Sequence, residues 1–261
     1  MYLNAFSGDC SRFYKLNIIS LRCITTMSLV DFAENGTHHP MFKLEHYFDI
    51  YDRYFSKYKG RPVRILEIGV CDGGSLDLWN SYFGSSNVEI VGIDINPDVK
   101  KFERDNISIV IIDQEDRTGL ETIFKNQRPF DIIVDDGGHR QQQQIKSFEA
   151  LFPLLHSEGT YLVEDIQTSY WKSYGGGLRL TNTFIEFSKK LSDYVNVHHF
   201  RSEDTIDIYP PLKNALKEEL IGVSYYDGIV VFCKGIKRVT AAFHYNGNGN
   251  IIKSSPLSLL Y

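Results

Sequence analysis

Two short acidic segments have the composition of a cation site. Asp135 and Asp136 open the sequence Asp-Asp-Gly-Gly-His, which ends at His139, and Glu164 and Asp165 follow a later apolar run. Carboxylates gathered in one cleft repel each other unless protons or a cation offset their charge. An all-oxygen set suits Mg²⁺ or another hard divalent cation rather than zinc. The sequence predicts Asp136, Glu164 and Asp165 as metal ligands and His139 as a proton acceptor beside them.

A second set of residues is typical of a cofactor site. Glu67 and Gly69 end the first apolar run, and Ser75 lies at the start of the segment that follows. A glycine turn lets a ligand approach the backbone closely, and the next helix offers free N–H groups. At the end of the second run, the Asp94 carboxylate can accept both hydrogen bonds of a ribose diol. At the end of the third run, Asp113 and Gln114 can reach the edge of an adenine. The predicted cofactor contacts are Glu67, Gly69, Ser75, Asp94, Asp113, Gln114 and Asp135.

The spacing of the glycines favours S-adenosylmethionine (SAM) over a dinucleotide. A dinucleotide site needs G-x-G-x-x-G to bring a helix N-terminus against the pyrophosphate, whereas Val70 and Cys71 follow Gly69 here. SAM has no phosphate, and an acidic strand end suits its cationic amino group. The alternatives are a dinucleotide-dependent oxidoreductase of the same fold class and a non-catalytic SAM-binding partner protein. Each residue taken singly also has an ordinary use, since glycines and aspartates serve turns and helix caps.

These residues fall at the ends of short apolar runs that predict buried strands. The runs are rich in Val and Ile and nearly continuous, as in strands buried on both faces; they cover residues 63–70, 88–95, 107–113, 130–136 and 160–166. Segments long enough for one helix each lie between them, at about 74–84, 97–105, 117–127 and 140–156. This alternation predicts an α/β fold with a doubly wound, mostly parallel sheet, whose carboxyl ends would gather the acidic residues. Asp227-Gly228, between two late apolar runs, predicts an antiparallel hairpin at the end of the sheet.

The chain divides into three predicted parts. Residues 1–58 form an N-terminal extension and helical segment, 59–235 the cofactor-binding domain, and 236–261 a C-terminal tail. Apolar residues at helical spacing predict an amphipathic helix over 41–58. The stretch 167–177, rich in Tyr, Trp and Gly, predicts a loop whose flat side chains could close over a sugar ring, with an ordinary surface loop as the alternative.

Composition excludes several classes of protein. The net charge of -5 over 261 residues, with no basic block, argues against a nucleic-acid or membrane-surface partner. No run approaches the ~18 apolar residues of a membrane span, and Lys15 and Arg22 interrupt the N-terminal apolar pieces, so we expect no signal peptide. The four cysteines form no Cys-x-x-Cys pair, which predicts a reducing, cytoplasmic setting.

Taken together, the motifs resemble the sugar O-methyltransferases of macrolide biosynthesis, such as the mycinamicin and demethylmacrocin enzymes, and their capsule-modifying relatives. The resemblance covers about residues 31–235 and is most specific in DDGGH and EDIQTSYW. It implies a seven-stranded methyltransferase fold and methyl transfer from SAM to a sugar hydroxyl of a natural-product glycoside or surface polysaccharide. It also implies Mg²⁺ bound by Asp136, Glu164 and Asp165, His139 as the base, and a homo-oligomer.

The chain departs from the family pattern at two places. Gly138 stands where the family usually has serine, and residues 36–39 read Gly-Thr-His-His in place of Gly-Thr-Asp-Lys. The first change is expected to have little effect. If the second segment touches the cofactor or the substrate, the difference predicts a different acceptor.

Overall fold

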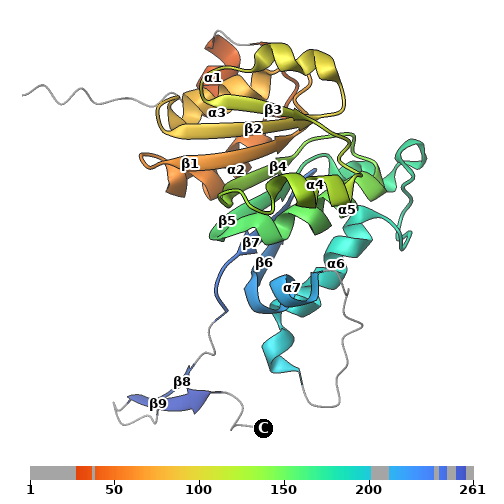
Figure 1. Cartoon of the computed structure of the whole chain (residues 1–261). Coiled ribbons are helices and arrows are strands. Elements are labelled where there is room, and N and C mark those ends of the chain that lie inside the picture. The colour runs from red at the N-terminus through yellow and green to blue at the C-terminus, as the bar shows by residue number, and fades with distance from the viewer. Residues whose placement is uncertain (1–27, 37–38, 201–211, 238–240, 246–250, 257–261) are drawn as a thin grey trace, which may run out of the picture.

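The sheet has the predicted topology. The computed structural model describes residues 28–36, 39–200, 212–237, 241–245 and 251–256. Seven of its strands form one sheet in the order β3-β2-β1-β4-β5-β7-β6 (Figure 1). They are β1 (Val63–Ile68), β2 (Val88–Asp94), β3 (Ile107–Ile111), β4 (Phe130–Asp135), β5 (Leu155–Val163), β6 (Leu220–Tyr225) and β7 (Val230–Lys234). Strands β1 to β5 pair in parallel, whereas β7 pairs antiparallel with both β5 and β6. The predicted doubly wound sheet and its terminal hairpin are therefore confirmed.

Helices cover the sheet, and several boundaries differ from the expected ones. The helices are α1 (Leu29–Asn35), α2 (Tyr47–Phe55), α3 (Gly74–Phe83), α4 (Arg117–Phe124), α5 (Gln141–Leu151), α6 (Phe184–Val195) and α7 (Lys213–Glu219). Short 3₁₀ segments are η1 (Ser56–Tyr58), η2 (Pro97–Phe102), η3 (Phe152–Leu154), η4 (Ile166–Tyr170), η5 (Lys172–Tyr174) and η6 (Val197–His199). The segment predicted as a helix at 140–156 is helical only to Leu151, because Pro153 follows and β5 begins at Leu155. The segment predicted as a helix at 97–105 is a 3₁₀ segment of six residues, because Glu103 is already extended and Arg104 pairs with Ile107 in the turn before β3. The helix predicted from residue 41 begins at Tyr47, because residues 39–44 are held non-helical against α3 by the hydrogen bond from His39 N to Asp77 Oδ2.

The two ends of the chain are described only in part. Residues 1–27 of the predicted N-terminal extension lie outside the described residues. In the predicted C-terminal tail, β8 (Ala241–Tyr245) and β9 (Ile251–Pro256) pair antiparallel as a separate two-stranded sheet. Among the residues that the structure describes, no helix has the length and apolar character needed to cross a bilayer.

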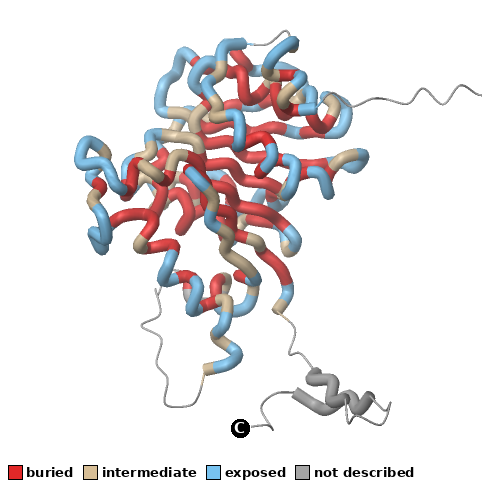
Figure 2. Tube along the Cα trace, turned by 180° about the vertical axis from the view of Figure 1, so that it is seen from behind, coloured by how far each residue is buried: buried red, intermediate tan, exposed pale blue. Residues whose placement is uncertain are grey.

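Two apolar clusters cover the two faces of the sheet. Figure 2 shows that the central strands are buried along most of their length. Val63 and Ile65 of β1 belong to one cluster, together with α2 and α3. Leu66 and Ile68 belong to the other, together with α4, α5 and α6. Since every residue of β1 is buried, a ligand can reach these strands only at the edge where their carboxyl ends meet the loops.

The turn after β1 requires a glycine at Gly69. Its φ is +90°, and a Cβ built there would lie 2.2 Å from the carbonyl oxygen of Asp136 in the turn after β4.

Gly69→Ala is therefore expected to lower the free energy of unfolding by about 3 kcal/mol or more, because it adds a backbone clash to the cost of a left-handed conformation. Gly60→Ala is the matched control, since Gly60 has a φ of +76° with no atom within 4 Å of the added Cβ. It should cost about 1 kcal/mol, and equal losses in urea denaturation would contradict the close approach of the two turns.

Candidate active site

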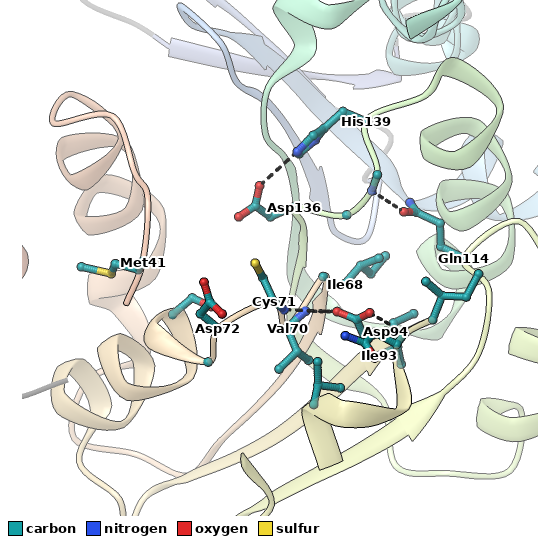
Figure 3. A pocket seen from close by; sticks show the side chains of 18 of the residues that line it. Met41, Ile68, Val70, Cys71, Asp72, Ile93, Asp94, Gln114, Asp136 and His139 are labelled. Carbon is teal, nitrogen blue, oxygen red and sulfur yellow. Dashed lines mark hydrogen bonds and ion pairs between the residues drawn. The ribbon is translucent and has the colours of Figure 1, made fainter. Parts of the chain in front are cut away.

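A cavity of about 670 Å³ opens at the carboxyl ends of β1, β2, β3 and β4 (Figure 3). Its walls are the segments that follow these strands, together with residues 40–43 of the chain before α2. Its volume is in the range of small-molecule sites. Five of the predicted cofactor residues line it: Gly69, Ser75, Asp94, Asp113 and Gln114.

Asp94 and Gln114 fix the backbone of the cavity wall. Asp94 Oδ2 accepts hydrogen bonds from the N–H groups of residues 70 and 71, at 2.9 and 3.1 Å. Gln114 Oε1 accepts from the N–H of Gly138 at 2.8 Å, and Gln114 Nε2 donates to Asp135 Oδ1 at 3.2 Å. Both were predicted to contact the cofactor. The structure shows that they also hold the glycine turn after β1 and the Asp-Asp-Gly-Gly-His turn after β4.

Asp135 does not face the cavity, contrary to the prediction. Its side chain is fully buried and bonds to Gln114, Ser147 and Tyr161. Burial raises the pKa of Asp135 to about 6, against the effect of the Ser147 hydroxyl. Consecutive residues at a strand end point to opposite sides, so only Asp136 of this pair can border the cavity. By accepting the hydrogen bond from Gln114 Nε2, Asp135 holds the Gln114 amide in place on the side away from the cavity.

Glu67 is also fully buried and leaves one carboxylate oxygen free. Trp79 Nε1 donates to Glu67 Oε2 at 2.7 Å, whereas Oε1 has no hydrogen-bond partner within the described part of the chain. Burial raises the pKa of Glu67 to about 7, although the nearby Lys43 ammonium opposes this shift. A buried acceptor without a donor is costly. An ammonium group reaching this oxygen, two residues before Gly69, would remove that cost.

Asp136, His139 and Asp165 converge at one edge of the cavity. One potential ligand atom of each lies within 4.8 Å of the other two. His139 Nε2 is 3.8 Å from Asp136 Oδ1 and 3.5 Å from Asp165 Oδ2, and Figure 3 shows the imidazole turned toward Asp136. Carboxylate and imidazole groups are ordinary ligands of divalent metals. The fold thus joins two predicted ligands with the predicted base.

Glu164, the third predicted metal ligand, is outside this group. Its side chain is buried; Oε1 accepts from the hydroxyl of Tyr51 at 2.7 Å and Oε2 from Lys43 Nζ at 2.8 Å. Lys43 Nζ also lies 2.6 Å from Asp136 Oδ2. Burial and the neighbouring Asp136 charge raise the pKa of Glu164 to about 8. A lysine ammonium therefore stands between two carboxylates that the sequence assigned to a metal.

Strained backbone is concentrated around this cavity. Four non-glycine residues of the described chain have positive φ angles, and three of them line the cavity: Cys71 (47°), His139 (55°) and Asp165 (53°). Such conformations cost about 1–3 kcal/mol each and persist where surrounding contacts enforce them. The hydroxyl of Thr168, for example, donates to the carbonyl oxygen of His139. The surrounding structure therefore holds these three side chains in fixed positions.

Two tyrosines of α2 position the acidic pair after β5. The hydroxyl of Tyr47 donates a hydrogen bond to Asp165 Oδ1 at 2.8 Å, and the hydroxyl of Tyr51 donates one to Glu164 Oε1. The sequence predicted only an amphipathic helix over 41–58 and gave no role to these two tyrosines or to Lys43. The available signal was the Tyr-x-x-x-Tyr spacing, which places two hydroxyl groups on one side of a helix.

Tyr51→Phe is expected to lower the free energy of unfolding by about 1–3 kcal/mol, because it leaves Glu164 Oε1 buried without its donor. Tyr54→Phe, on the same helix, is the control. It breaks a hydrogen bond of 2.9 Å to the Tyr226 hydroxyl at a half-buried position, where a loss under about 1 kcal/mol is expected. Chemical denaturation compares the two, and a larger loss for Tyr54→Phe would contradict the assigned role of Tyr51.

Comparison with known proteins identifies the relatives of the chain. No family model matches it. The mycinamicin VI 2''-O-methyltransferase of Micromonospora griseorubida is 40% identical over 209 residues, which cover 75% of this chain and 50% of that enzyme. The demethylmacrocin O-methyltransferase of Streptomyces fradiae is 39% identical over 133 residues, 48% of this chain and 33% of that enzyme. The chain is a homologue of sugar O-methyltransferases. It spans about half the length, or less, of these curated relatives.

The fold of this sugar O-methyltransferase homologue matches a solved structure. A methyltransferase of the mycinamycin biosynthetic pathway, determined in complex with Mg and SAH, superposes with a TM-score of 0.69 at 30% identity. The match covers 81% of this chain and 55% of that one. Together with the observed strand order, it confirms the SAM methyltransferase fold that the resemblance implied.

Proposed function

We propose that the chain transfers a methyl group from SAM to a hydroxyl group of a sugar, with a divalent cation such as Mg²⁺ assisting. The observation that carries this proposal is the convergence of Asp136, His139 and Asp165 on the rim of a cavity bounded by the glycine turn. The relatives support the acceptor class, since one is named as a 2''-O-methyltransferase of mycinamicin VI and another as a 2'-O-methyltransferase of an α-L-rhamnosyl tetracenomycin-C.

The residues at the cavity fit both a hard divalent cation and SAM. The carboxylates of Asp136 and Asp165 supply the oxygen ligands that a hard divalent cation prefers, within 4.8 Å of each other. Glu67 does not itself line the cavity, but its unpaired Oε1, two residues before Gly69, is the proposed acceptor for the cationic amino group of SAM. Asp94 and Asp113 lie on the cavity wall, where they can accept hydrogen bonds from a ribose and an adenine. Glu164 is the third proposed metal ligand, and its Oε2 now accepts a hydrogen bond from Lys43 Nζ.

The chain's own residues perform three tasks in this scheme. SAM brings the electrophilic methyl group, and a divalent cation lowers the pKa of a coordinated hydroxyl when it is bound. Asp136 and Asp165 hold the cation. His139 accepts the proton of the acceptor hydroxyl, a role worth about 10²–10⁴-fold in rate. The two turns fixed by Asp94 and Gln114 keep donor and acceptor aligned for in-line displacement.

The segment after β5 begins beside the cavity, since Asp165 lines it and η4 follows directly, and the sugar would approach along this segment. The predicted loop at 167–177 contains the 3₁₀ turn η5 and most of η4. Trp171 is about half exposed, and its ring lies 5.9 Å from that of Tyr174. Flat aromatic faces of this kind stack on sugar rings. We assign this pair to acceptor binding.

The remaining predictions from sequence concern the reaction class, the partners, the oligomeric state and the location of the protein. The relatives favour a methyltransferase over the dinucleotide-dependent oxidoreductase. We infer a small-molecule or glycan substrate and no nucleic-acid partner. Self-association into a homo-oligomer and a cytoplasmic location are predictions from sequence.

Methyl transfer from isotopically labelled SAM to a panel of 6-deoxysugar glycosides tests the proposal. Labelled product should form with Mg²⁺ present, fall by about a hundredfold or more in excess EDTA, and return when Mg²⁺ is restored in excess, because the cation activates the hydroxyl. Full activity in excess EDTA would remove the metal from the scheme. Binding of NAD(P)H without binding of SAM or SAH, measured by thermal shift, would favour the oxidoreductase.

A further inference from the structure

Lys43 occupies the point where two proposed metal ligands meet. Its Nζ lies 2.6 Å from Asp136 Oδ2 and 2.8 Å from Glu164 Oε2. The Lys43 side chain is 3% exposed and that of Glu164 is 1% exposed. The Asp136 side chain is 22% exposed, and two carboxylates this close still repel unless a positive charge lies between them. In the structure the lysine ammonium provides that charge.

A divalent cation and the ammonium cannot share this point. A hard cation bound to both oxygens would lie about 2.0–2.6 Å from each, which is nearly where Nζ is now. Two cations that close to one another would repel in a region with little water. We propose that Lys43 is an internal counter-ion that must leave Asp136 and Glu164 before a divalent metal can bind both, and that it thereby sets the metal affinity of the site. This inference rests on the proposed function through the ligand roles of Asp136 and Glu164.

The surroundings of Lys43 allow this exchange. Residues 40–43 line the cavity, so the lysine stem borders open space on one side. The segment is fixed at one end by the hydrogen bond from His39 N to Asp77 Oδ2 at 2.9 Å and at the other by the start of α2. Rotation of the flexible stem can therefore move the ammonium into the cavity while the backbone stays in place.

Removing the charge of Lys43 has two opposite consequences. Without a metal, Asp136 and Glu164 lose their counter-ion, so the free energy of unfolding falls. With a metal, the cation no longer competes with the ammonium, so its affinity rises. Because a ligand stabilises the state that binds it, the melting temperature of the variant should rise more steeply with metal concentration than that of the wild type.

The experiment compares Mn²⁺ binding to the wild-type chain, Lys43→Met and Lys59→Met, without SAM or substrate. Methionine keeps much of the stem and removes the charge. Lys59 is the matched control, since its ion pair with Asp52 lies on the surface beyond the cavity. Free Mn²⁺ measured by electron paramagnetic resonance should show that Lys43→Met binds on the order of ten to a hundredfold more tightly than the wild type. Lys59→Met should match the wild type.

Lys43→Gln keeps the test decisive if Lys43→Met fails to fold, because the amide can still donate a hydrogen bond to either carboxylate. It too should bind Mn²⁺ more tightly, and its melting temperature should depend more on metal. If the wild type binds Mn²⁺ and the folded variants bind it equally or less tightly, the counter-ion role is overturned while the metal-dependent function stands. If neither the wild type nor the variants bind Mn²⁺, the metal part of the proposed function fails, and this inference fails with it.

Discussion

Asp136→Ala is expected to abolish divalent-cation binding and to reduce methyl transfer by about a thousandfold or more, equivalent to roughly 4 kcal/mol of transition-state stabilisation. Asp136 takes part in both sets of contacts at the site, one with His139 and one with Lys43. Its Oδ1 faces His139 Nε2, and its Oδ2 pairs with Lys43 beside Glu164. Removing this carboxylate therefore takes one ligand from the proposed metal site, one counter-charge from Lys43 and one neighbour from the His139 imidazole.

Three measurements on Asp136→Ala separate loss of the metal from loss of the fold. Mn²⁺ binding and labelled methyl transfer should both disappear, whereas SAH binding should persist because Asp94 and the glycine turn are untouched. Asp98→Ala, at an exposed position on η2 that does not itself line the cavity, should leave all three unchanged. Metal binding that survives in Asp136→Ala would show that the cation binds elsewhere on the chain.

His139→Ala is expected to slow methyl transfer by about 10²–10⁴-fold, the usual contribution of a positioned general base. SAH and Mn²⁺ should bind nearly as in the wild type, so that the turnover number falls while the Michaelis constants stay close to their original values. His139 has a φ of +55°, which disfavours alanine. His139→Asn is therefore the companion variant, because asparagine tolerates the left-handed region better and cannot act as the base.

The His139 variants also decide between two roles for the imidazole. Its Nε2 is near enough to Asp136 and Asp165 to serve as a metal ligand instead of a base. A base is expected to show partial rescue by added imidazole and unchanged metal affinity. Loss of Mn²⁺ binding comparable to that of Asp136→Ala would assign His139 to the metal. His156→Ala, at an exposed position on β5, is the control for loss of a histidine.

Much of the fold was predictable because its signals are local. The apolar runs that became the central strands β1 and β4 are continuous, as strands buried on both faces must be, whereas β3 lies at the edge of the sheet and is partly exposed. The Asp227-Gly228 turn gave the hairpin of β6 and β7, and Gly228 has the positive φ that such a turn requires. Since parallel strands end on the same edge, these runs also predicted which loops border the cavity. The helix start at Tyr47 was not predictable in this way, because a contact with α3 holds the preceding residues out of the helix.

The sequence by itself determined the strands, the turn residues and the acidic groups at the strand ends, because each depends on neighbours along the chain. Only the tertiary structure decided where those groups point. It buried Asp135 behind Gln114 and brought Lys43 to Glu164 across 121 positions of sequence. The periodicity of the sequence carries no information about such pairs, because they depend on the order of the strands in the sheet and on the packing of α2 against it. The charge balance of the site is therefore a property of the folded chain.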